Sequence, residues 1–134
     1  MPIRDKEGKT EIFDPIRKKW VLLTEEEKVR QYCIHQLLHR HEFPATLIAV
    51  EKQITLNGLT KRYDIVVFNR TGAPYLVIEC KAPSVKLNQA VLEQVARYNA
   101  TLKAEIIGVT NGVEYRFFNI DFNSLQITEI NFEF

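Results

Sequence analysis

The sequence predicts a single mixed α/β domain in which helices flank a sheet. Two observations carry this prediction: several apolar runs are rich in β-branched and aromatic residues, and two other stretches have apolar residues at helical spacing. A third is their order along the chain, which is helix, three strands, helix, then further strands. The 134 residues have the length of one domain, so we expect residues 1–134 to form a single unit.

Bulk composition limits the class of protein. The net charge is +1, whereas a strongly basic chain would have indicated a nucleic-acid partner directly. No apolar run has the length of a membrane span, and none follows Met1 as a signal peptide would. Cys33 and Cys80 have apolar neighbours and are expected to be buried thiols, which fits a reducing, cytoplasmic setting.

The chain should begin with residues 1–19 as an extended lead-in, because this stretch has mixed charge, prolines and little periodicity. Thr24 and Glu27 then form a capping-box pattern for a helix that should end near residue 41. On a helical wheel Glu26 falls near the middle of the apolar stripe, and Glu27 falls toward its edge. We therefore expect Glu26 to point toward the core and Glu27 to serve the cap.

Three strands and a second helix should follow. The strands are predicted at 47–56, 62–68 and 75–81, with turn residues between them, including the strong hairpin pair Asn57-Gly58. Residues 87–103 have helical spacing, and Gln94 falls in the middle of their apolar stripe as a polar group on a buried face. Further short strands are expected at 106–110, 112–118 and 125–130.

Charged residues in the second and third strands are the strongest functional signal. A four-residue loop that pairs Asn69 with Pro74 would place Asp64 opposite Glu79, and side-chain alternation would put Lys81 on the same face. Facing carboxylates destabilise a sheet unless a cation lies between them, and Mg²⁺ prefers such oxygen ligands. The pattern therefore predicts a metal site suited to phosphodiester hydrolysis.

A simpler interpretation of the same residues stays open. Asp64 would then be an edge-strand charge, and Glu79 with Lys81 would form a local ion pair at a strand end.

Residues 24–116 resemble the N-terminal domain family of type I restriction enzyme R subunits, a branch of the PD-(D/E)xK nuclease superfamily. The stretches that carry the resemblance are TEEEKVRQ (24–31), KRYDIVV (61–67), VIECKAP (77–83) and QVARYN (94–99). The resemblance implies a restriction-endonuclease-like α-β-β-β-α-β core, which matches the order derived above. The proline that gives the motif its name is absent, because Tyr63 precedes Asp64.

The resemblance also implies roles for individual residues. Asp64 is the motif aspartate, Glu79 its acidic member and Lys81 its lysine, while Glu26 is the first-helix glutamate, with Glu27 as the alternative. Gln94 and Tyr98 match a Gln-x-x-x-Tyr motif found in some branches. We expect Asp64, Glu79 and the carbonyl of Cys80 to bind Mg²⁺ or Mn²⁺. Lys81 would then position the attacking water, and Gln94 would hold the lysine or touch a phosphate.

The expected function is metal-dependent hydrolysis of nucleic acid, with DNA as the leading substrate and RNA open. The chain has no Gly-x-x-x-x-Gly-Lys-Ser/Thr loop, so we expect a stand-alone nuclease domain without a motor of this type. A homodimer, or a separate motor or recognition subunit, stays open as a partner. The alternative function is a non-catalytic module of the same fold that binds nucleic acid or protein.

Overall fold

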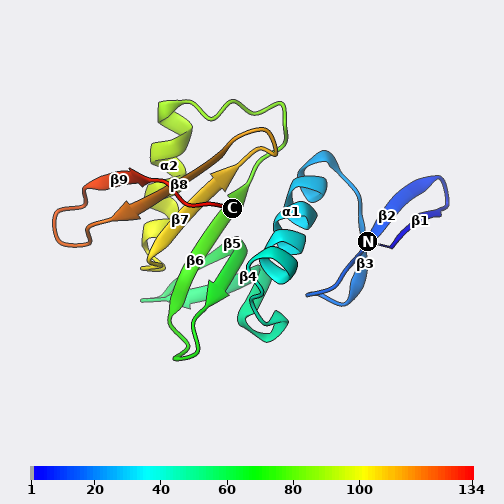
Figure 1. Ribbon diagram of the computed structural model, residues 1–134, viewed down its shortest axis with the longest axis horizontal. Helices are drawn as coiled ribbons and strands as arrows, with labels where there is room; N and C mark the ends of the chain where they lie inside the picture. Colours follow the sequence, from blue (N-terminus) through cyan, green and yellow to red (C-terminus); the bar gives the residue numbers. More distant parts are fainter. Residues whose placement is uncertain (1) are drawn as a thin grey trace.

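The computed structural model describes residues 2–134 and contains a small and a large sheet with two main helices (Figure 1). A π-helical segment (Gln36–Arg40) follows the first helix, and a 3-10 turn (Ala45–Leu47) leads into the large sheet. The main elements, in chain order, are β1 (Ile3–Lys6), β2 (Lys9–Asp14), β3 (Lys19–Leu22), α1 (Glu25–His35), β4 (Ile48–Leu56), β5 (Leu59–Phe68), β6 (Pro74–Cys80), α2 (Gln89–Ala100), β7 (Ile106–Thr110), β8 (Tyr115–Ile120) and β9 (Ile127–Ile130).

The large sheet has the strand order β4-β5-β6-β7-β8-β9. Strands β6 and β7 are parallel, because α2 connects them as a crossover, and the other neighbours are antiparallel. The series α1, β4, β5, β6, α2, β7 is the order expected from the sequence. The predicted fold class, a mixed α/β sheet flanked by helices, is therefore confirmed.

The N-terminal segment differs from the prediction. Residues 1–19 were expected as an extended lead-in, but β1, β2 and β3 pair as an antiparallel sheet. The turn between β1 and β2 explains the difference, because Glu7 and Gly8 have φ of 53° and 79°. Positive φ at both central residues is typical of a two-residue hairpin turn. Figure 1 shows this small sheet beside α1, away from the strands of the large sheet.

The core lies on both faces of the large sheet. Ile65 and Ile78 are fully or almost fully buried in a cluster that includes the α1 residues Cys33 and Ile34. The adjacent residues along these strands point to the other face of the sheet. There the clusters of buried residues include residues of α2 and of the segment after it. Burial of both faces explains why β5 and β6 read as continuous apolar runs rather than alternating ones. No helix among residues 2–134 is long and apolar enough to cross a membrane.

Two predicted side-chain orientations are wrong. Glu27, not Glu26, is the buried first-turn glutamate, because Arg17 and Arg30 neutralise its charge inside the fold. Gln94 is exposed, since the buried stripe of α2 is centred on a neighbouring set of residues: Leu92, Val95, Ala96 and Asn99. The apolar spacing had placed Val91 and Tyr98 on the buried face, but Val91 is half-buried and Tyr98 is exposed.

Candidate active site

The pairing of β5 with β6 sets the geometry of the site. Ile65 pairs with Ile78 and Val66 with Val77, which is the register that was predicted to bring Asp64 opposite Glu79. The predicted loop is wrong, because Phe68 pairs with Pro74 and an irregularity between Val67 and Phe68 absorbs the extra residue. A bulge near the turn therefore keeps the expected register in the part of the hairpin that leads to the charged residues.

Asp64 is clamped between neighbouring elements. Its Oδ2 accepts a hydrogen bond from the backbone N–H of Cys80 at 2.8 Å, and its Oδ1 accepts one from Arg30 Nη2 at 3.1 Å. The side chain is only 13% exposed. These contacts, one from β6 and one from α1, hold the carboxylate in one orientation.

Glu51 of β4 lies across from Asp64. The pairs that flank it are Val50 with Ile65 and Lys52 with Tyr63, while Glu51 itself has a φ of 54°. Positive φ is costly for a residue other than glycine and tends to be retained at functional sites. The strained position lies where the Glu51 carboxylate meets Arg30 Nη2 at 2.7 Å.

Three carboxylates converge at this point. Oxygens of Glu26, Glu51 and Asp64 lie within 4.8 Å of one another, and we call these residues the acidic cluster. Arg30 Nη2 contacts every member, including Glu26 at 2.9 Å, and Arg30 Nη1 contacts Glu27 at 2.6 Å. Burial opposes the charge of Arg30, but Asp64, Glu27 and Glu51 outweigh it and raise the pKa of its guanidinium.

Glu79 and Lys81 line a neighbouring pocket of about 230 Å³ together with the α2 residues Gln94, Val95, Tyr98 and Asn99. Lys81 Nζ lies 3.7 Å from Glu79 Oε1. Burial, followed by the charge of Asp64, raises the pKa of Glu79 to about 7, although Lys81 acts in the opposite direction. Burial, with the negative charge of Asp64 beside it, therefore favours the protonated form of Glu79 more than it would for an exposed glutamate.

The predicted residues thus fall into two adjoining groups. Asp64 and Glu26 belong to the acidic cluster, whereas Glu79, Lys81 and Gln94 line the pocket beside α2. The two groups adjoin at Asp64 and Glu79, because the negative charge of Asp64 contributes to the raised pKa of Glu79. The Cys80 thiol is buried, and hydrogen bonding to Cys33 and burial raise its pKa, so the predicted role of Cys80 rests on its backbone alone.

Sequence reasoning missed Arg30 and Glu51. Arg30 stands four residues after Glu26, a spacing that places two side chains together on a helix. Glu51 could have been found from the Asn57-Gly58 turn, because a two-residue turn pairs Leu56 with Leu59 and so brings Glu51 across from Asp64. Helical spacing and hairpin register are thus the two signals that point to these residues.

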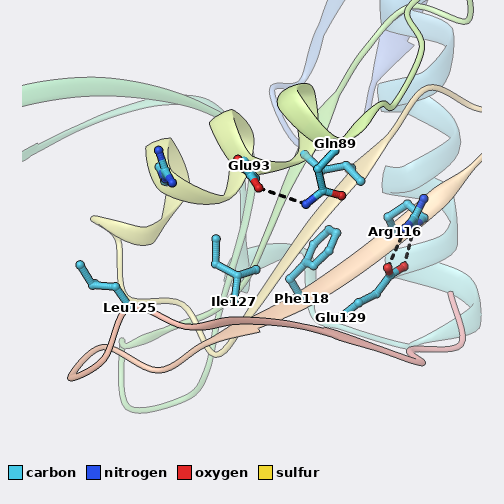
Figure 2. Close-up of a pocket in the computed structure, with 9 residues that line it drawn as sticks. Gln89, Glu93, Arg116, Phe118, Leu125, Ile127 and Glu129 are labelled. Carbon is cyan, nitrogen blue, oxygen red and sulfur yellow. Dashed lines mark hydrogen bonds and ion pairs between the residues drawn. The ribbon is translucent and has the colours of Figure 1, made fainter.

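A separate groove of about 350 Å³ lies between α2 and the strands β8 and β9 (Figure 2). Two polar pairs lie within the groove: Arg116 Nη2 contacts Glu129 Oε1 at 2.6 Å, and the neutral amide Gln89 Nε2 donates to Glu93 Oε1 at 3.1 Å. Phe118 and Ile127 form part of its apolar lining. None of the predicted site residues lines this groove, so it is separate from the candidate active site.

These features define a mixed α/β domain with a carboxylate-rich site that spans α1 and three adjacent strands. The chain belongs to the family described as the type I restriction enzyme R protein N terminus (HSDR_N), which matches residues 25–132.

Among solved structures, the chain is similar to one described as a fragment of an HsdR subunit of a type I restriction enzyme from Vibrio vulnificus YJ016. The similarity has a TM-score of 0.53 at 20% sequence identity and covers 81% of this chain. It covers only 23% of the solved chain, so this protein spans about a quarter of that length. At this identity the similarity supports the fold. No curated protein matches.

Proposed function

We propose that this domain hydrolyses phosphodiester bonds in DNA with the help of Mg²⁺ or Mn²⁺, as a nuclease of the PD-(D/E)xK type. The observation that carries the proposal is the convergence of Glu26, Glu51 and Asp64 within 4.8 Å, beside Glu79 and Lys81. Membership of a restriction enzyme R-protein family supports DNA as the substrate. The restriction-type nuclease interpretation of the sequence points to the same chemistry.

The donor set fits a hard divalent cation. Carboxylate oxygens are the ligands that Mg²⁺ prefers, and the cluster supplies them from α1, β4 and β5. The sequence predicted a ligand set of Asp64, Glu79 and the Cys80 carbonyl. Asp64 is also a member of the acidic cluster, so it would be the central ligand. The metal would supply charge that activates a water molecule and polarises the phosphate.

The remaining residues would position the substrate. Lys81 is about one-third exposed and faces the pocket that Gln94 and Tyr98 line, so its ammonium can offset charge that develops on the phosphate. Gln94 is exposed, so its amide oxygen can accept a hydrogen bond from Lys81 or its amide N–H can donate to a phosphate oxygen. In-line attack requires little covalent help, so such positioning would supply much of the rate.

Cleavage of supercoiled plasmid DNA tests the proposal. Asp64→Asn and Lys81→Ala should each lower Mn²⁺-dependent cleavage at least about 100-fold while the protein stays folded. Asp121→Asn and Lys9→Ala are matched controls, because Asp121 lies in the β8–β9 turn and Lys9 in β2, both exposed. Wild-type protein that cleaves neither DNA nor RNA would contradict the enzymatic function.

One observation favours a second candidate, a non-catalytic module of the same fold that binds nucleic acid or protein. Arg30 already gives the acidic cluster an internal counter-ion, as a domain without metal would need. Such a module should show no rise in melting temperature with Mn²⁺, whereas a metal-binding nuclease gains stability by mass action.

The domain's partners belong to the same proposal. The family name and the 23% coverage of the Vibrio vulnificus chain favour association with a motor or recognition subunit over a homodimer. A cytoplasmic location fits two cysteines that are both free and buried. Co-purification from the native cell, followed by a mass measurement of the complex, tests which partner is present.

A further inference from the structure

Arg30 is shared unevenly between two sets of carboxylates. Its Nη1 contacts Glu27 at 2.6 Å, and its Nη2 contacts Glu51 at 2.7 Å, Glu26 at 2.9 Å and Asp64 at 3.1 Å. The Arg30 side chain is only 5% exposed, and its contacts with Glu27 and Asp64 are largely removed from water, whereas Glu51 is 25% and Glu26 50% exposed. Nη2 of Arg30 thus contacts all three members of the acidic cluster, and the exposed Arg62 adds a longer contact to Glu51 at 3.4 Å.

Arg30 Nη2 has fewer N–H groups than there are carboxylates around it. Nη2 of an arginine has two N–H groups, but three carboxylates lie within hydrogen-bond distance of it. The donor that could have helped, Arg30 Nε, is buried without a hydrogen-bond partner among the described residues. The Cys80 N–H and the exposed Arg62 supply further donors to Asp64 and Glu51, but the three carboxylates still share only one buried positive charge, and an additional cation would relieve this.

The opposite side of Arg30 is well anchored. Glu27 also accepts from Arg17 Nη2 at 2.8 Å and from Gln31 Nε2 at 3.0 Å. Arg17 Nε in turn lies 2.6 Å from the fully buried Asp14. Asp14 and Arg17 lie before residue 25, where the family match begins, so the strand β2 and the turn between β2 and β3 supply this anchor.

From this asymmetry we propose that Arg30 is the resident counter-ion of the acidic cluster, and that a divalent cation binds by displacing its Nη2 while Nη1 stays on Glu27. The inference rests on the proposed metal site and assigns to Arg30 a positioning role in it. A guanidinium brings one positive charge and a planar fork of donors, whereas Mg²⁺ or Mn²⁺ brings two charges and can accept several oxygens. Exchange of Arg30 Nη2 for the metal ion would therefore supply the positive charge and the ligand contacts that Arg30 alone does not give the acidic cluster.

Mn²⁺ binding, followed by the electron paramagnetic resonance signal of free Mn²⁺, tests the inference without any activity assay. After removal of metals with EDTA, Arg30→Met should bind Mn²⁺ about tenfold more tightly than wild type, because a competing positive charge is gone. Arg30→Lys should lie between them, because an ammonium cannot bridge Glu27 and the acidic cluster as the guanidinium does. Arg116→Met is the matched control, since Arg116 forms its ion pairs outside the site, and should bind as wild type does.

The outcomes separate this inference from the proposed function. If wild type binds Mn²⁺ but Arg30→Met binds equally or less tightly, Arg30 does not compete with the metal and the inference is overturned. If Arg30→Met does not fold, Arg30→Lys decides by the same criterion. If wild type fails to bind while an Arg30 variant binds, Arg30 blocks the site and does not yield it to the metal, so both the displacement and the metal-dependent function are wrong. If none of the proteins binds, both are wrong.

Discussion

Two arginines in different regions of the molecule show how strongly burial changes the energetic importance of an ion pair. Arg30 contacts four carboxylates with a side chain that is 5% exposed. Arg116 contacts Glu129 at 2.6 Å and Glu114 at 3.7 Å, but its side chain is 33% exposed. Both arginines thus face more than one carboxylate, and water screens the Arg116 group more completely, because Glu26 is the one partner of Arg30 that is as exposed as Glu114 and Glu129.

The difference indicates which arginine is linked to a function. Around Arg116, solvent compensates the excess negative charge, so the pair is expected to stabilise the β8–β9 hairpin slightly and do nothing more. Around Arg30, the carboxylates of Glu27 and Asp64 are 7% and 13% exposed, and a missing charge partner there is costly, whereas Glu51 and the half-exposed Glu26 lie nearer the solvent. A surplus of negative charge around a buried arginine is what the proposed cation site requires.

The sharpest test of this contrast is the stability of Arg30→Met in the absence of metal. Removal of one partner from a buried charge network leaves the others uncompensated, so we expect a loss of about 3 kcal/mol in the free energy of unfolding. Urea unfolding in EDTA measures it. A loss below about 1 kcal/mol would place Arg30 with the surface pairs and remove the distinction between the two regions.

Arg17→Met should have the next largest effect, about 2 kcal/mol, because it leaves Asp14 and Glu27 with fewer partners. The Asp14 side chain is fully buried, and its pKa is lowered because hydrogen bonds and the charge of Arg17 outweigh the effect of burial. Arg17→Lys should recover part of the loss, since it restores the charge without the fork of donors. An unchanged urea midpoint for Arg17→Met would show that the N-terminal sheet does not brace the site.

The same contrast explains what the sequence could and could not predict. Strand order and the β5–β6 register were predictable, because β-branched runs and turn residues act over short distances. Asp64, Glu79 and Lys81 stood out because charges in apolar strands are rare and need a reason. The paired charges that surround them involve residues far apart in the chain, as between Arg30 and Asp64, and periodicity carries no information about such contacts.

Helix faces were predicted less well than strands for a related reason. The wheel placed Glu26 inward because it considered only the apolar residues of α1, whereas Arg17 and Gln31 create a buried polar surface for Glu27. The N-terminal strands were missed because their turn depends on positive φ at Glu7 as well as at Gly8. A glutamate in that conformation has no sequence signature.

The pH dependence of the free energy of unfolding is a third test, and the expected change is on the order of 2 kcal/mol. The pKa of Glu79 is raised to about 7 by burial and by Asp64, so folded protein holds a proton there that the unfolded chain has already released. The free energy of unfolding should therefore fall as the pH rises from about 5 to 8. Asp14 has a lowered pKa, so its contribution is lost only in more acidic solution.

Glu79→Gln isolates this effect, because the amide keeps the shape of the side chain and cannot ionise. The variant should unfold with a nearly flat pH profile across the same range, measured by urea unfolding in EDTA. A wild-type profile as flat as that of the variant would mean that Glu79 is ionised throughout this range, and that Lys81 outweighs burial and Asp64.

The smallest effect is expected for Arg116→Met, below about 1 kcal/mol. Glu129 and Glu114 lose their partner, but both are exposed enough for water to replace it. Salt sharpens the comparison: in about 1 M NaCl, where charges are screened within roughly 3 Å, the Arg116→Met loss should vanish and most of the Arg30→Met loss should remain. Equal salt sensitivity in the two variants would mean that solvent reaches the acidic cluster as freely as it reaches β8, and the argument that burial makes Arg30 a counter-ion would fail.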